Sequence, residues 1–154
     1  MSEAKQYLTS EKLAEFTKEL DFLKTEKRKQ IAENLEYAKK LGDLSENAEY
    51  NEARQQQGEI EDRINHLENL IKTAEIADGK KGDIVSIGSI VKIQKEGEKD
   101  VLEYKIVGSE EADMTVNKIS NLSPLGGALL GKKKGDKIAV STPKGIVTYI
   151  LLLF

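Results

Sequence analysis

Two heptad-patterned segments flank a short turn, and this pattern constrains the fold more than any other feature of the chain. In the second segment the seam positions alternate in steps of four and three residues, as in a coiled coil; they are Ala53, Gln57, Ile60, Ile64, Leu67, Ile71 and Ala74. The first segment keeps the same rhythm, slips after Lys27 and then resumes, which predicts a local change of winding. Its seam positions are Leu13, Phe16, Leu20, Leu23, Ile31, Leu35, Ala38 and Leu41.

The turn between the segments predicts an antiparallel hairpin. Gly42 suits the position that follows a helix C-terminus, and Thr9 or Ser10 suits the cap that begins the first helix. A helix over residues 10–41 would extend about 48 Å. The alternative is a continuous helix in a dimeric coiled coil, which Gly42 and Asp43 in mid-helix would destabilise.

Composition sets limits on the class of protein. The chain has 154 residues, of which 33% are charged and 5% aromatic, and it has no Cys, so a disulfide framework and thiolate metal sites are excluded. Residues 1–78 carry 12 basic and 18 acidic side chains, a net charge of −6, whereas residues 79–154 carry 12 and 9, a net charge of +3. An acidic half does not bind nucleic acid by bulk electrostatics, so such a role must be local or go through a partner. Without a signal region or membrane-length apolar run, we expect a cytoplasmic protein.

The second half of the chain changes to a period of two after a linker at residues 78–83. We expect strands at residues 84–87, 90–93, 102–107, 137–141 and 146–154. Ser123 and Pro124 suit the start of a short helix over residues 125–130, which Gly131 would end. The sequence therefore predicts an α+β protein. Residues 1–78 form a coiled-coil hairpin with an acidic tip at 42–46, and residues 79–154 form a small antiparallel sheet with one helix.

The tip contains two carboxylates, Asp43 and Glu46. Two such groups can hold a hydrated Mg²⁺ through oxygen, but they are too few to bind it tightly alone. This favours a site completed by another protein, in which the metal would stabilise an attacking hydroxide. The alternative is a capping box, in which Asp43 caps the following helix and Glu46 reaches back.

Three basic residues lie near the predicted tip, Lys39 and Lys40 in the first helix and Arg54 in the second. A cation there can bind a phosphate or an RNA end beside the acids. The alternative is an ordinary solvated helix face with intrahelical ion pairs.

The tip sequence from Gly42 to Tyr50 resembles the signature of the bacterial Gre-type transcript cleavage factors, in particular the GreA branch. The resemblance continues at Arg54, Gln57 and Ile64 and through the second half, in order and over nearly the whole chain. The similar segments there are residues 106–108, 111–113, 119–120, 123–126, 128–132, 135–136 and 142–145.

The resemblance implies a C-terminal domain similar to the FK506-binding proteins, which docks at the rim of the secondary channel of RNA polymerase. It implies that the factor is a monomer whose tip acids, Asp43 and Glu46, reach the active centre of the polymerase. There the two acids would help to hold Mg²⁺, which they bind only within the complex. The polymerase itself then cleaves the 3′ end of backtracked RNA, so the factor is not an enzyme. Lys39 and Arg54 match the RNA-contacting basic positions, and the docking candidates are Glu111, Asp113, Ser123 and Pro124.

Three other interpretations stay open. An inhibitory family member would block the channel, although the intact pair of tip acids argues against it. A prolyl isomerase would line its pocket with aromatic side chains, and the second half has only Tyr104, Tyr149 and Phe154. A coiled-coil adaptor would tolerate a neutral tip.

Overall fold

The computed structural model describes residues 5–43, 46–79 and 82–154, and the chain divides into two compact units. One unit is Leu13–Thr73, and the other combines Met1–Lys12 with Ala74–Phe154. The sequence predicts a division at residue 78, which would place the first twelve residues with the hairpin. In the structure, residues 5–12 instead belong to the C-terminal unit. Within the described part of the chain, no helix has the length and apolar character needed to cross a bilayer.

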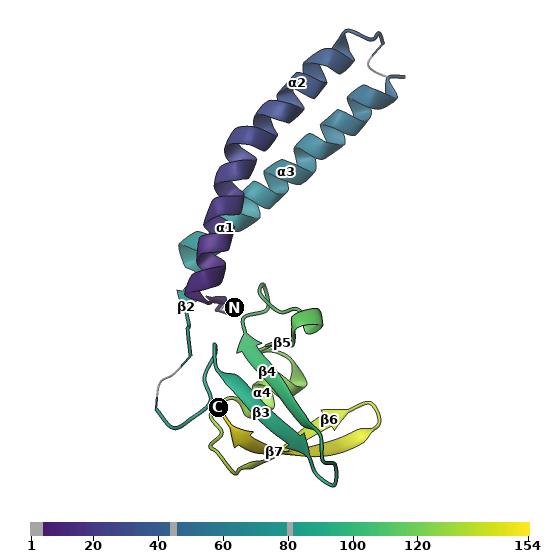
Figure 1. Ribbon diagram of the computed structural model, residues 1–154. Coiled ribbons are helices and arrows are strands. Elements are labelled where there is room, and N and C mark those ends of the chain that lie inside the picture. The colour runs from purple at the N-terminus through teal and green to yellow at the C-terminus, as the bar shows by residue number, and fades with distance from the viewer. Residues whose placement is uncertain (1–4, 44–45, 80–81) are drawn as a thin grey trace. The chain divides into compact units, whose positions relative to one another are not determined.

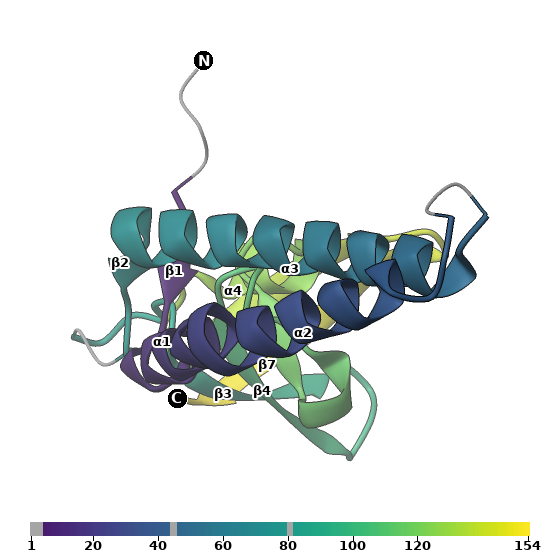
Figure 2. The same ribbon diagram turned by 90° about the horizontal axis from the view of Figure 1, so that it is seen from above.

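The hairpin consists of two helical arms that run side by side in opposite directions (Figures 1 and 2). Its first arm comprises α1 (Ser10–Phe22), the π-helical turn η1 (Leu23–Lys27) and α2 (Arg28–Lys39), and its second arm is α3 (Ala48–Thr73). The π-helical turn lies where the heptad rhythm slips. Because a π turn accommodates one extra residue, it allows both Leu23 and Ile31, eight positions apart, to be buried in the seam.

Of the eight buried residues on the described arms, seven occupy predicted heptad positions. Phe16, Leu23, Ile31 and Ala38 are buried on the first arm, as are Ala53, Ile64, Leu67 and Leu70 on the second. Two predicted details are wrong: Leu41 is 51% exposed beyond the end of α2, and Leu70 rather than Ile71 is the fully buried residue near the end of α3. The remaining pattern confirms that the apolar stripe packs one arm on the other.

Of the two predicted helix-terminal residues, Thr9 is confirmed as a cap, and Gly42 lies one position later than predicted. The Thr9 hydroxyl accepts a hydrogen bond from the Lys12 amide at 3.2 Å, which satisfies one donor of the first turn of α1. Gly42 has a φ of +135°, a conformation that side-chain-bearing residues rarely adopt, but it lies two positions beyond the C-cap Lys40 and not directly after it. Thr9 therefore begins the first arm, and Gly42 belongs to the turn beyond its end.

The C-terminal unit is built on a curled five-stranded sheet in the order β5-β4-β3-β7-β6. The strands are β3 (Ile90–Lys95), β4 (Val101–Val107), β5 (Lys118–Ser120), β6 (Lys137–Thr142) and β7 (Gly145–Leu153), with α4 at Pro124–Leu129. The α+β class and the short helix are confirmed. The sheet is mixed rather than wholly antiparallel, since β5 pairs parallel to β4. The predicted strand at residues 84–87 is wrong, because these residues form turns and irregular backbone.

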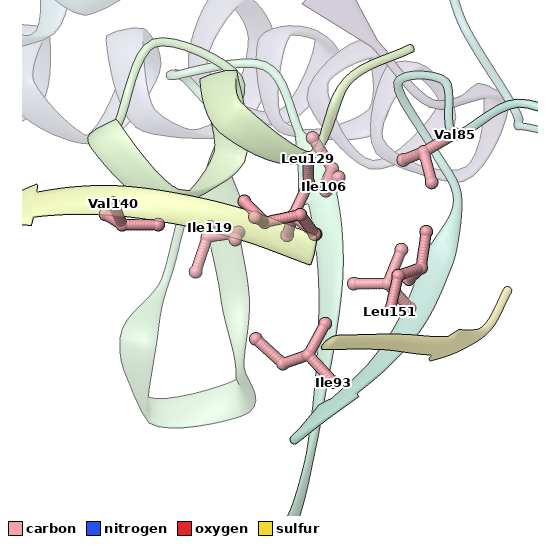
Figure 3. Packing of buried hydrophobic residues seen from close by; sticks show 9 residues of the cluster. Val85, Ile93, Ile106, Ile119, Leu129, Val140 and Leu151 are labelled. Carbon is pink, nitrogen blue, oxygen red and sulfur yellow. The ribbon is translucent and has the colours of Figure 1, made fainter. Parts of the chain in front are cut away.

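One face of this sheet carries the apolar core beside α4 (Figure 3). Alternate residues of β3 are buried, as are alternate residues of β6, which is the expected pattern for a sheet covered on one side. The buried cluster consists of Val85, Val91, Ile93, Ile106, Ile119, Leu129, Ile138, Val140 and Leu151. Val85 thus reaches the core from irregular backbone, although its apolar neighbours resemble a strand in the sequence.

The N-terminal residues join the C-terminal unit through a short parallel ladder and a buried carboxylate. The ladder pairs β1 (Tyr7–Leu8) with β2 (Glu75–Ile76). Glu111 is 4% exposed, and its carboxylate accepts hydrogen bonds from the Thr9 hydroxyl at 2.8 Å and the Thr9 amide at 3.2 Å. Lys118 Nζ lies 3.6 Å from the same carboxylate. These donors and the cation compensate for removing the charge from water.

Replacing Gly108 by Ala is expected to lower the free energy of unfolding of the C-terminal unit by about 3 kcal/mol, because overpacking forces the backbone to move. A Cβ atom on Gly108 would lie 1.9 Å from the Tyr7 carbonyl oxygen. Urea unfolding followed by circular dichroism measures the change. Gly127→Ala is the matched control, because its Cβ would lie 3.5 Å from the Asn121 carbonyl oxygen. Equal stability of the two variants would contradict the prediction.

Candidate functional site

The structure places both predicted tip acids on the surface of the hairpin end. Asp43 follows α2 and Glu46 precedes α3, and both residues are exposed. They line one open hollow of about 370 Å³ together with Leu41, Asn47, Ala48 and Glu49. The hollow therefore brings Asp43 and Glu46 to one side of the tip and adds a third carboxylate, Glu49, that the sequence analysis does not single out.

The cap of α3 is Asn47, and the alternative of an Asp43 capping box is wrong. The helix begins at Ala48, so Glu46 lies before the helix instead of at its third position. Asn47 Oδ1 accepts a hydrogen bond from the Tyr50 amide at 3.0 Å, which is the geometry of an N-cap. The same side chain donates from Nδ2 to the Ala38 carbonyl oxygen at 2.6 Å. Capping of α3 thus does not require the tip acids.

The tip residues fit a hard divalent cation only as part of a larger ligand set. Carboxylate oxygens are the ligands that Mg²⁺ prefers, and Asp43 and Glu46 supply them at an exposed end of the molecule. Among residues 5–43, 46–79 and 82–154, no group of three or more His, Cys, Asp or Glu side chains is arranged to hold a metal. Two carboxylates supply fewer oxygen ligands than Mg²⁺ takes, so a site built on these acids would need further ligands from water or from another molecule.

Interhelical ion pairs define two flanks of the hairpin. On one flank Lys24 Nζ lies 2.9 Å from Glu68, and Arg28 lies 2.8 Å from Glu61. Both members of the Lys24–Glu68 pair follow a buried seam residue by one position. On the other flank Arg63 lies 2.8 Å from Glu19, and these residues instead precede their seam neighbours. In two antiparallel helices, equal offsets from facing seam residues lead to the same side.

By this register Lys39 and Arg54 lie on the first flank, close to the tip. Lys39 follows the buried Ala38, and Arg54 follows the buried Ala53. Both cations are exposed, and Arg54 Nη1 donates to Gln57 at 2.9 Å within its own helix. We call the surface formed by Lys39 and Arg54 the cationic flank. Its two residues lie on different arms of the hairpin, near the tip acids.

The opposite flank near the tip is acidic. A hollow of about 240 Å³ lies there, lined by Asn34, Tyr37, Ala38, Glu49, Glu52, Ala53 and Gln56. Tyr37 is 63% exposed beside the carboxylates. The described residues on the two sides of the hairpin end thus differ in charge, and those of the cationic flank are suited to contact phosphate groups.

The docking candidates of the C-terminal unit have different environments. Glu111 is buried and its carboxylate is engaged by Thr9, so the structure gives this residue a role inside the unit. Asp113 is exposed, and hydrogen bonds from Thr115 to its carboxylate hold its pKa below the ordinary value. Ser123 caps α4 by accepting from the Gly126 amide at 3.1 Å, and Pro124 is exposed at the first helical position.

Replacing Ser123 by Ala is expected to cost about 1 kcal/mol of stability, because the cap of α4 is lost. The Ser123 hydroxyl also donates to the Ser120 carbonyl oxygen at 2.6 Å, so two hydrogen bonds depend on it. Thermal unfolding measures the change, and Pro124→Ala serves as a control that keeps the cap. An unchanged melting temperature for Ser123→Ala would show that the hydroxyl is dispensable to the fold.

Sequence reasoning misses Asn47 as the residue that organises the tip. The signal is present, since Asn is among the best caps and stands directly before a long periodic segment. Asp43 and Glu46, a few residues earlier, have the spacing of a capping box, so the sequence suggests Asp43 as the N-cap instead. The hydrogen bond from Asn47 to Ala38, by contrast, joins the two arms, and no local sequence pattern in either arm predicts it.

Comparison with known families matches both halves of the chain. A family profile described as "Transcription elongation factor, N-terminal" matches residues 6–76. A second profile, "Transcription elongation factor, GreA/GreB, C-term", matches residues 80–152. Together the two profiles cover almost the whole sequence, including the tip and the C-terminal sheet.

Similar proteins extend over the same length. "Transcription elongation factor GreA" of Clostridium botulinum (strain Kyoto) is 51% identical over 99% of this chain and 97% of its own. The protein of that name from Clostridium novyi (strain NT) is 46% identical over 99% and 98%. Among solved structures, GreA factor homolog 1 (Gfh1) of Thermus thermophilus is 27% identical, covers 97% of this chain and 98% of its own, and has a TM-score of 0.45.

Proposed function

The chain belongs to the GreA/GreB family of transcription elongation factors, and from this premise we propose that it stimulates transcript cleavage by bacterial RNA polymerase. In this proposal the hairpin enters the secondary channel of a backtracked polymerase. The polymerase then cleaves the 3′ end of its nascent RNA, and the arrested complex resumes elongation. The factor itself is not an enzyme, since its partner supplies the reaction centre.

The observation that carries the proposal is the pair of exposed carboxylates, Asp43 and Glu46, on one hollow at the end of the hairpin. Neither acid is part of the buried apolar seam, and Asn47 rather than either acid caps α3. Packing and capping of the arms therefore do not account for the two acids. Mg²⁺, held jointly with the polymerase, would supply an activated water for phosphodiester hydrolysis. The chain's part is to bring two oxygen ligands to that centre and hold them there.

Charge at the hairpin end supports a particular orientation toward the RNA. The cationic flank presents two exposed cations next to the acids, whereas the opposite flank carries Glu49 and Glu52. In the proposed complex Lys39 and Arg54 contact phosphates near the 3′ end. The N-terminal half has a net negative charge, but these two cations can still attract RNA phosphates because the attraction is local.

The C-terminal unit would dock at the rim of the channel through Asp113, Ser123 and Pro124. Asp113 and Pro124 are exposed, and Ser123 is half-buried. Glu111 would support this surface from inside, by holding the N-terminal residues against the unit. We expect the factor to act as a monomer in the cytoplasm, because the antiparallel hairpin buries its seam within one chain.

The proposal is tested by adding the purified protein to stalled, backtracked elongation complexes with 3′-labelled RNA. We expect a short labelled fragment to appear faster than with polymerase alone, and chelation of Mg²⁺ to abolish it. The shortened 5′ portion should extend when nucleotides are added. No increase in cleavage would contradict the proposal. Slower cleavage than with polymerase alone would indicate an inhibitory factor instead.

A further inference from the structure

A single side chain joins the two arms at the tip. Asn47 Nδ2 donates to the Ala38 carbonyl oxygen at 2.6 Å, and Asn47 Oδ1 accepts from the Tyr50 amide at 3.0 Å. A carbonyl oxygen can only accept and a backbone amide can only donate, so these partners fix the orientation of the side-chain amide. One amide group therefore links the last turn of α2 to the first turn of α3; we call this pair of hydrogen bonds the Asn47 link.

Small side chains line the region between the arms near this link. Ala38 is 1% exposed and Ala53 is 4% exposed, and both border the same hollow beside the tip. The separation of two packed helices depends on the side chains at their contact, and alanine permits a close approach. A side chain as short as asparagine can then reach a main-chain carbonyl of the opposite arm.

The segment closed by the link contains both tip acids. Ala38 and Asn47 are nine positions apart, and Glu46 is the immediate neighbour of Asn47. Among the described residues of this segment, Leu41 is 51% exposed, so its burial in the seam does not hold the segment in place. The Asn47 link provides a polar constraint at the two ends of the segment.

We propose, building on the proposed function, that Asn47 is a positioning residue for the tip acids during RNA cleavage. It contacts neither RNA nor metal; it fixes the ends of the segment that presents Asp43 and Glu46. Ligands held by supporting hydrogen bonds keep the geometry that a metal site requires, and loss of such support typically costs about tenfold or more in activity. Ordering the segment before binding also lowers the entropy cost of assembling the site.

Two substitutions separate the link from the helix cap. Asn47→Asp keeps the shape and the acceptor for the Tyr50 amide but cannot donate to the Ala38 carbonyl. Asn47→Ser is also a good cap but is uncharged and too short to bridge both partners. Agreement between the two variants would exclude the added charge as the cause. Asn51→Asp is the matched control, because it adds the same charge on the first turns of α3 at an exposed position.

The first measurement is cleavage in backtracked complexes over a range of factor and Mg²⁺ concentrations. We expect Asn47→Asp and Asn47→Ser to lower the maximal cleavage rate about tenfold. The factor concentration for half-maximal effect should stay unchanged, and the Mg²⁺ concentration for half-maximal effect should rise. Asn51→Asp should match the wild type. A loss that disappears at high factor concentration would place Asn47 in binding instead and overturn the proposal.

The second measurement follows the tip without polymerase. Because the chain has no native Cys, spin labels can be attached at Lys40→Cys and Glu49→Cys to give a distance distribution across the tip. We expect a narrow distribution for the parent protein and a broader one for both Asn47 variants. Unchanged distributions, or broad ones with a wild-type maximal cleavage rate, would each overturn the positioning role. If the wild type itself fails to stimulate cleavage, the proposed function fails, and the positioning role in cleavage fails with it, whatever the distances show.

Discussion

Replacing Asp43 by Asn is expected to lower the maximal rate of factor-stimulated RNA cleavage about 100-fold, the loss typical when one electrostatic contact to a reacting centre is removed. The substitution keeps the size of the side chain and removes its negative charge. An amide is a weaker ligand for Mg²⁺ than a carboxylate, and it cannot offset the charge of the ion. Because Asn47 rather than Asp43 caps α3, the thermal stability of the hairpin should stay close to that of the wild type.

Glu46→Gln should give a loss of similar size, and the double variant should be little worse than either single one. Two groups that act on one ion form a unit, so the effects of removing them do not add. Glu49→Gln is the matched control, since Glu49 borders the same hollow without a proposed role in the metal site. All variants should reach half-maximal effect at the wild-type concentration of factor. Wild-type cleavage by Asp43→Asn would show that its carboxylate is not a metal ligand.

Removing both residues of the cationic flank, by Lys39→Ala with Arg54→Ala, is expected to raise the factor concentration for half-maximal cleavage about 100-fold. Each lost charge-assisted contact to a phosphate is worth about 1.5 kcal/mol, which is roughly tenfold. The dependence of this concentration on salt should become shallower, because fewer phosphates are neutralised. Titrations of cleavage against factor at several salt concentrations measure both effects. The maximal rate should change less, which distinguishes these cations from the tip acids.

Arg28→Ala is the control for the cationic flank. Arg28 follows the same flank farther from the tip, where it pairs with Glu61 and both side chains are 42% exposed. Exposed ion pairs of this kind contribute about 0–1 kcal/mol, so the hairpin should remain folded and active. Glu52→Gln tests the opposite flank and should leave the salt dependence intact. If Arg28→Ala were as damaging as the double variant, phosphate attraction would not be specific to the tip.

The sequence predicts the hairpin well because its signals are local. Seam residues recur at intervals that place them on one side of a helix, so the buried Phe16, Ile31 and Leu67 can be read directly from spacing. The slip after Lys27 likewise predicts altered winding, and the structure shows it as the π-helical turn at Leu23–Lys27. Strand positions are predicted less accurately, since Val85 has strand-like neighbours but reaches the core from irregular backbone.

The sequence by itself determined the two heptad arms, the turn with its acids and the alternating strands, because these depend on neighbours a few residues apart. Only the tertiary structure decided which distant groups meet. Thr9 hydrogen-bonds to Glu111, 102 residues away, and thereby joins the N-terminal residues to the C-terminal unit. Asn47 reaches Ala38 on the other arm, and β5 pairs parallel to β4. A buried carboxylate or carbonyl must find a donor from whatever segment packs against it, and local periodicity cannot identify that segment.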